Sequence, residues 1–140
     1  MRPPYFRVLS VLVRVALREA GCNPNNRDSD DFKRTFREPI YGTLFDIARE
    51  NLTVQDVVIV GPFTREQRER GWPAKLTRIL GGPAEVHYVS CPAEIRRKRL
   101  AQRGNARDHA KLRNWEHYIQ YYGEHPPVFE HVRIDGAHLE

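Results

Sequence analysis

The sequence predicts an α/β fold, with a parallel sheet flanked by helices. Three short runs rich in β-branched residues, at 57–60, 86–89 and 132–135, are separated by segments with helical spacing. The first run, Val-Val-Ile-Val, is apolar at every position, which is typical of a strand buried on both faces of a parallel sheet. Strands that alternate with helices favour this same architecture.

Length and charge narrow the class of protein. A chain of 140 residues with 40% hydrophobic residues predicts a single folded domain, 1–140, with a real core. The net charge of +5 indicates an anionic partner: a nucleotide, a phosphorylated metabolite or nucleic acid. Two distant cysteines, without metal-ligand spacing, favour a reduced, cytoplasmic protein without a bound metal. The apolar run 8–13 is too short for a bilayer, which needs about 20 residues, so we expect no membrane partner.

The remaining elements follow from periodicity and turn residues. A strand over 6–13 is an alternative to the first helix, because valine is dense there. Turn-forming residues predict a polar loop over 22–31, and Trp72-Pro73 is expected to separate two helices. The predicted helices span residues 5–20, 39–52, 65–70, 74–80, 93–102 and 108–122.

Arginines concentrate in the segment 96–113, which follows the second predicted strand. Ligands of open α/β sheets bind beyond the carboxyl ends of the strands. Arg99 and Arg103 are four residues apart and therefore share a helical face. Their planar guanidinium groups suit phosphate oxygens. A phosphate site and a merely solvated basic face both remain open.

Two further groups have both a functional and a structural interpretation. The aspartates of the polar loop can bind Mg²⁺ or a substrate hydroxyl, or they can be solvated or cap a helix. Outside this loop, Asp108 is expected to cap the helix that follows it. The tyrosines can stack on bases, which with the arginines would suit nucleic acid, or they can line the core and its rim. The residues concerned are Asp28, Asp30, Asp31, Tyr118, Tyr121 and Tyr122.

Three segments resemble the small P-loop kinases. Arg99-Leu-Ala-Gln-Arg103 resembles the R-L-x-x-R signature that opens the lid of the gluconate-kinase-like and zeta-toxin-like families, which are often labelled AAA-family ATPases. The segment 29–33 is similar to their aspartate pair followed by an apolar and a basic residue. The segment 41–63 is similar to their helix, strand and Pro-Phe loop. The resemblance covers residues 11–135.

This resemblance implies a P-loop NTPase-like fold and an ATP-dependent phosphotransferase that acts on a small hydroxyl substrate, with ATP and Mg²⁺ as cofactors. It places Asp30 at the acceptor hydroxyl, as a catalytic residue. Arg103 would stabilise the transferring phosphoryl group. The residues implied in substrate or phosphate binding are Asp31, Arg65, Arg99 and Arg107.

Two departures from the family pattern limit the expected activity. No stretch fits G-x-x-x-x-G-K-[ST], and no glycine or lysine precedes Val11. Gly61 stands where many relatives place an aspartate for Mg²⁺. We therefore expect a truncated or degenerate kinase-like domain with an altered or missing first strand, which binds ATP weakly or not at all and does not turn it over. The alternatives are a basic, non-catalytic module that binds RNA or another polyanion, and a chain that folds only with a partner that fills its sheet.

Overall fold

The computed structural model describes residues 15, 17–19, 21 and 30–138. The chain forms two compact units: Met1–Pro62 with Thr77–Pro83, and Phe63–Leu76 with Ala84–Glu140. Units of this kind can be parts of one domain, so the single-domain prediction stays a prediction. Most of the predicted helix 5–20 and most of the polar loop lie outside the described residues, although residues 15 and 17–19 are helical.

The first unit is built on one long helix, α2 (Asp30–Asn51). It begins nine residues before the predicted start at Pro39, which therefore lies inside the helix and costs about 3 kcal/mol in such a position. The buried face offsets this cost, because it continues on both sides of the proline. Its buried apolar residues are Phe32, Ile40, Tyr41, Leu44, Phe45 and Ala48.

The predicted strand 57–60 is wrong. The segment has no regular secondary structure, and Val58 and Val60 are 87% and 77% exposed. An apolar run forms a strand only where a neighbouring strand takes up its backbone hydrogen bonds. The sheet of the described residues has two strands, and neither of them pairs with this segment.

The Trp72-Pro73 pair begins a helix and does not break one. α3 (Trp72–Leu80) contains both residues, and the segment 65–70, predicted as a helix, forms only a single 3₁₀ turn, η2 (Glu66–Arg68). Proline is tolerated in the first turn of a helix, where its missing N–H has no intrahelical acceptor. Trp72 is buried there, with the Lys75 ammonium 5.6 Å from the centre of its ring.

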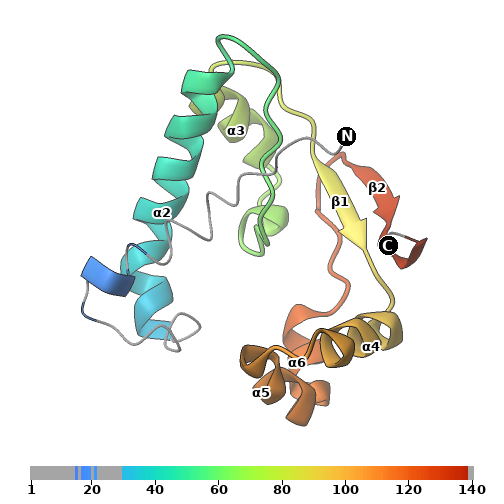
Figure 1. Ribbon diagram of the computed structural model, residues 1–140. Coiled ribbons are helices and arrows are strands. Elements are labelled where there is room, and N and C mark those ends of the chain that lie inside the picture. The colour runs from blue at the N-terminus through green and yellow to red at the C-terminus, as the bar shows by residue number, and fades with distance from the viewer. Residues whose placement is uncertain (1–14, 16, 20, 22–29, 139–140) are drawn as a thin grey trace. The chain divides into compact units, whose positions relative to one another are not determined.

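The second unit contains a parallel pair of strands, β1 (His87–Ser90) and β2 (Val132–Asp135). Their register runs from His87 opposite Val132 to Ser90 opposite Asp135. Figure 1 shows the two strands side by side, pointing the same way. The predicted α/β class with a parallel sheet is thus confirmed for these two strands, and β2 has the predicted bounds.

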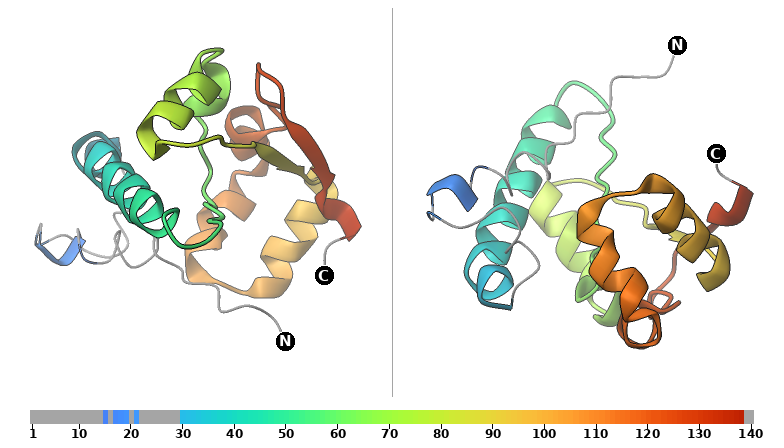
Figure 2. Two further views of the ribbon diagram at one scale, coloured as in Figure 1. Left: turned by 90° about the horizontal axis from the view of Figure 1, so that it is seen from above. Right: turned by 60° about the horizontal axis from the view of Figure 1, so that its bottom comes forward.

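The second unit also contains η2, the first part of α3 and three further helices: α4 (Ala93–Arg103), α5 (His109–Arg113) and α6 (Trp115–Tyr122). A 3₁₀ turn, η3 (Ala106–Asp108), precedes α5, and another, η4 (Gly136–His138), follows β2. Figures 1 and 2 show that α4 begins just beyond the carboxyl end of β1.

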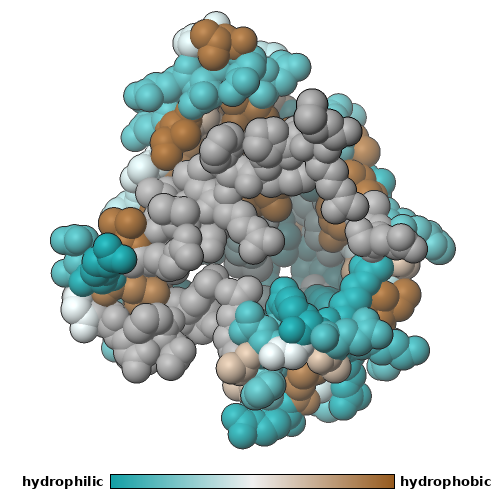
Figure 3. Space-filling view, in the orientation of Figure 1, coloured by the Kyte–Doolittle hydropathy of each residue, from teal (hydrophilic) through white to brown (hydrophobic). Residues whose placement is uncertain are grey.

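The single helix predicted over 108–122 is wrong, because the chain leaves helical geometry at Asn114, with φ −111° and ψ 48°. Asparagine has a low helix propensity and readily forms a helix boundary. Trp115, which follows the break, is buried. Figure 3 shows mainly hydrophilic residues over the visible face of the helices of this unit.

Two glycines should respond to alanine in opposite directions. Gly42 is exposed inside α2 with open space around it, so Gly42→Ala should raise the free energy of unfolding by about 0.5–1 kcal/mol. Gly104 ends α4 with φ +59°, so Gly104→Ala should lower it by about 1 kcal/mol or more. Urea unfolding would measure both, and a Gly104→Ala variant as stable as the unsubstituted chain would contradict the left-handed helix end.

Candidate functional site

The carboxyl edge of the parallel pair is closely packed at Gly136. This glycine is buried, and a Cβ added to it would lie 2.8 Å from the carbonyl oxygen of Ser90 and 3.0 Å from Val89 Cγ1. The chain after β2 therefore runs directly against the end of β1. Ser90 itself is buried and accepts a hydrogen bond from Nε of Arg133 at 3.3 Å.

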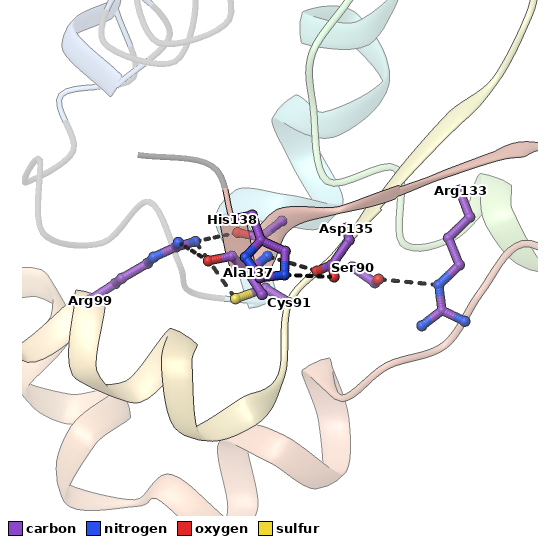
Figure 4. Close-up of polar contacts among 8 residues, drawn as sticks. Ser90, Cys91, Arg99, Arg133, Asp135, Ala137 and His138 are labelled. Carbon is purple, nitrogen blue, oxygen red and sulfur yellow. Dashed lines mark hydrogen bonds and ion pairs between the residues drawn. The ribbon is translucent and has the colours of Figure 1, made fainter.

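Arg99 joins α4 to this edge (Figure 4). Its Nη1 donates to the carbonyl of Gly136 at 2.6 Å, and its Nη2 donates to the carbonyl of Ala137 at 2.9 Å. The sulfur of Cys91 lies 3.8 Å from Nη1. The same turn is fixed from the other side, because Asp135 accepts a hydrogen bond from the Ala137 N–H at 2.8 Å. Arg99 thus has a structural contact here, and its predicted phosphate contact stays a prediction.

Arginines attach α4 to the rest of the second unit. No residue of this helix is buried, so apolar packing holds it weakly. Arg96 donates to the carbonyl of Tyr122 at 2.7 Å, at the end of α6. The guanidinium carbon of Arg97 lies 5.6 Å from the centre of the Trp115 ring. The basic segment is therefore more than a solvated face, since several of its arginines make defined contacts.

Arg103, one helical turn beyond Arg99, binds the carboxylate of Asp108. Both Nε, at 3.0 Å, and Nη2 donate to Oδ2. Lys111 donates to the other oxygen, Oδ1, at 3.1 Å. Asp108 is completely buried, whereas Arg103 is 49% exposed and Lys111 is 31% exposed. We refer to these three residues as the Asp108 cluster.

Asp108 is charged in this cluster. Burial alone would raise the pKa of the Asp108 carboxyl, but the hydrogen bonds and positive charges of Arg103 and Lys111 outweigh it and lower the pKa below its usual value. Asp108 precedes α5 as the sequence predicts, but its side chain makes no capping hydrogen bond. The carboxylate accepts hydrogen bonds from the two cations instead, so the predicted cap is wrong.

Within β1, Tyr88 lies against His131, with the ring centres 5.8 Å apart. Burial raises the pKa of the Tyr88 hydroxyl, and the carboxylate of Glu124 raises it further, against the lowering effect of Arg96 and Arg133. The neutral phenol is therefore the stable form at physiological pH.

The tyrosines of α6 pack mainly on one another. The ring centres of Trp115 and Tyr118 are 5.4 Å apart, and those of Tyr118 and Tyr122 are 5.1 Å apart. Tyr121 is 64% exposed, while Tyr118 and Tyr122 are half-buried. This arrangement matches the core-and-rim interpretation for two of the three tyrosines.

The other predicted site residues are only partly described. Asp30 begins α2 and Arg107 lies in η3, but their side chains lie outside the described part of the structure. Asp31 is exposed and forms an ion pair with Arg34, one turn along α2. Arg65 is exposed and precedes η2. The two aspartates belong to the first unit and the arginines to the second, so the structure brings together only residues of the second unit.

Sequence reasoning missed Lys111 and assigned Asp108 only to a helix end. The signal was present, because a lysine three residues after an aspartate lies on the same side of a helix. Within the described residues, no three acidic, histidine or cysteine side chains converge as a metal site would require. None of the described helices has the length and hydropathy needed to cross a membrane.

Comparison with protein families shows which family the chain belongs to. The model of a family described as an AAA domain matches residues 2–125. The matched span includes α2, α3, β1 and α4 to α6. Neither the curated proteins nor the solved structures contain a significant match to this chain.

Loss of the Arg99 contacts should loosen the second unit. Arg99→Ala should lower the free energy of unfolding by about 1–2 kcal/mol, because it leaves two carbonyls without their charged donor. Lys98→Ala removes the same charge from the preceding residue, which is exposed, and should change the stability by less than about 0.5 kcal/mol. Equal effects of the two substitutions in urea unfolding would show that the Arg99 contacts contribute nothing.

The Asp108 cluster should contribute to stability above acidic pH. The folded-state pKa of Asp108 lies below the unfolded value of about 3.9, so its contribution is present above that pH and is lost as the pH falls through the folded pKa. Asp108→Asn should therefore be less stable than the unsubstituted chain at pH 7, and the difference should shrink below about pH 4. Unfolding measured from pH 7 to pH 2.5 would test this, and a difference independent of pH would contradict it.

Proposed function

Because the chain belongs to the family of AAA domains, a P-loop NTPase-like family, we propose that it is a kinase-like domain that binds the phosphate groups of ATP through the second unit. The observation that carries the proposal is the Asp108 cluster, in which two cations with exposed surface meet within the matched span. The resemblance of the segment 99–103 to the lid of small P-loop kinases supports the same role.

The residues of the cluster fit a phosphate group. Nη1 of Arg103 has no acceptor in the part of the chain that the structure describes, and Lys111 Nζ carries three protons, of which Asp108 accepts one. The cluster has a net charge of +1, with the negative charge inside and the positive charges toward solvent. Arginine and lysine donors of this kind form charge-assisted hydrogen bonds to phosphate oxygens.

In this proposal ATP would supply the phosphoryl group, and Mg²⁺ bound with it would neutralise part of the phosphate charge. In an intact relative, the aspartate at the position of Asp30 would orient the acceptor hydroxyl and take its proton as the new bond to phosphorus forms and the bond to the leaving ADP breaks. Arg103 stabilises the charge that develops on the transferring group. The remaining residues proposed to bind substrate or phosphate are Asp31, Arg65, Arg99 and Arg107.

The proposed turnover is weak or absent. In P-loop kinases, backbone N–H groups of a glycine-rich loop surround the phosphates, and a lysine neutralises them. The 140 residues contain no G-x-x-x-x-G-K-[ST] segment, so in this proposal the side-chain cations of the Asp108 cluster take the place of that loop. We therefore propose phosphate binding without efficient phosphoryl transfer.

Calorimetric titration with Mg·ATP tests the proposal. We expect a Kd of about 0.1–1 mM for the unsubstituted chain, since few charge-assisted hydrogen bonds are available. Arg103→Ala should weaken binding by about tenfold or more, because it removes a charged donor worth more than 1 kcal/mol. Lys98→Ala, on the same helix and with the same change of charge, should change the Kd by less than about twofold.

Three results would contradict parts of this account. Steady-state phosphorylation that disappears in Arg103→Ala would show a working kinase and overturn the predicted lack of turnover. If Lys98→Ala weakened Mg·ATP binding as much as Arg103→Ala does, general positive charge would explain the binding, and no specific site would be needed. RNA affinity that falls steeply with salt, together with indifference to ATP, would identify the chain as a basic binding module.

A further inference from the structure

Asp108 is the one polar side chain that is completely buried among the described residues. It lies between α4 and α5, four residues after Gly104 reverses the chain. Arg103 approaches it from the end of α4, and Lys111 approaches it from α5. One carboxylate thus joins cations from two helices.

A buried carboxylate that binds two cations restricts both of them. Arg103 uses two nitrogens on the same oxygen, which fixes the plane of its guanidinium group as well as its distance. Lys111 is held by the opposite oxygen. Both side chains would otherwise sample many rotamers, because arginine and lysine lose about 2 kcal/mol of rotamer entropy when they are fixed.

The negative charge of Asp108 does not itself favour the binding of an anion to the cluster. Without Asp108, the pair Arg103 and Lys111 would carry two positive charges, and with it the cluster carries one. An anion is therefore attracted less strongly by Coulomb forces when Asp108 is present. What Asp108 adds is order, since two flexible cations become two fixed ones before a ligand arrives.

We propose that Asp108 is a positioning residue, which holds Arg103 and Lys111 as a preorganised pair for one phosphate group of the nucleotide. This inference rests on the proposed function, and it adds Lys111 as the second phosphate ligand of that site. Asp108 makes no contact with the phosphate in this arrangement and acts only through the two cations.

Asp108→Asn distinguishes positioning from simple charge. The amide keeps the shape of the side chain but removes the negative charge, so the net charge of the cluster rises by one. Simple electrostatics predicts tighter binding of an anion to this variant, whereas positioning predicts weaker binding. Inorganic tripolyphosphate and Mg·ATP are suitable probes, and we expect the Kd of each to rise by about tenfold, the effect of losing one well-placed charged hydrogen bond.

Two further variants keep the test informative if Asp108→Asn folds poorly. Lys111→Gln changes a partly exposed residue and should weaken tripolyphosphate binding by about the same factor as Arg103→Ala, because the two cations bind one phosphate group. Asp108→Glu keeps the charge but moves the carboxylate by one methylene. It should weaken binding too, although Coulomb forces alone predict no change.

The NMR signal of the Arg103 Nε–H reports the position of this side chain without any ligand. In the unsubstituted chain it should exchange slowly with water, since Nε donates to a buried carboxylate. In Asp108→Asn it should exchange at least about tenfold faster, because the charge-assisted bond is weakened. An unchanged signal would overturn the positioning role.

The outcomes separate this inference from the proposed function. Binding of Mg·ATP that is unchanged or tighter in Asp108→Asn would overturn the positioning role and leave the proposed function standing. Failure of the folded, unsubstituted chain to bind either probe would overturn both. Weaker binding in Asp108→Asn and Lys111→Gln, with normal binding in Lys98→Ala, would support the inference.

Discussion

The parallel pairing of β1 with β2 is the constraint on which the second unit depends. It brings the ends of both strands to one edge, where the buried Gly136 lies against the carbonyl of Ser90. That close approach places the carbonyls of Gly136 and Ala137 where Arg99 donates hydrogen bonds to them. These bonds attach α4 to the edge of the sheet. Since α4 has no buried residue, these contacts take the place that apolar packing has in most helices. The direction of α4, and with it the position of Arg103, follows from the strand pairing.

The arginines of α4 attach the helix to the rest of the unit and also provide the cations of the proposed phosphate site. Arg96, Arg99 and Arg103 are spaced at intervals of three and four, so they share one face, and each binds a different segment of the unit. An arginine can satisfy a carbonyl or carboxylate with part of its fork and keep other N–H groups for a ligand. The same spacing therefore attaches the helix and provides the cations for the proposed phosphate site.

The sequence predicted those parts of the fold whose signal is local. The runs that became β1 and β2 lie between turn residues, and the helix 93–102 is preceded by Pro92 and followed by Gly104. The run 57–60 has an equally strong apolar pattern but no strand beside it in the described residues, and a pattern cannot show whether a partner is present. The prediction started α2 at Pro39, nine residues late. The burial that offsets the cost of a proline inside the helix is a tertiary effect, which the local sequence does not show. For the site, the spacing of Arg99 and Arg103 placed both on α4, whereas the pairing of Arg103 with a buried aspartate depends on the turn at Gly104 and has no sequence signature.

The most direct test of the central claim is to follow the backbone amide signals of the isotope-labelled chain by NMR while Mg·ATP is added. The account predicts that the largest shifts fall on residues 103–111, around the Asp108 cluster, with smaller shifts on the residues that Arg99 contacts. Shifts concentrated at Tyr121 and the exposed end of α6, or no shifts at millimolar Mg·ATP in a folded chain, would contradict a phosphate site at the end of α4.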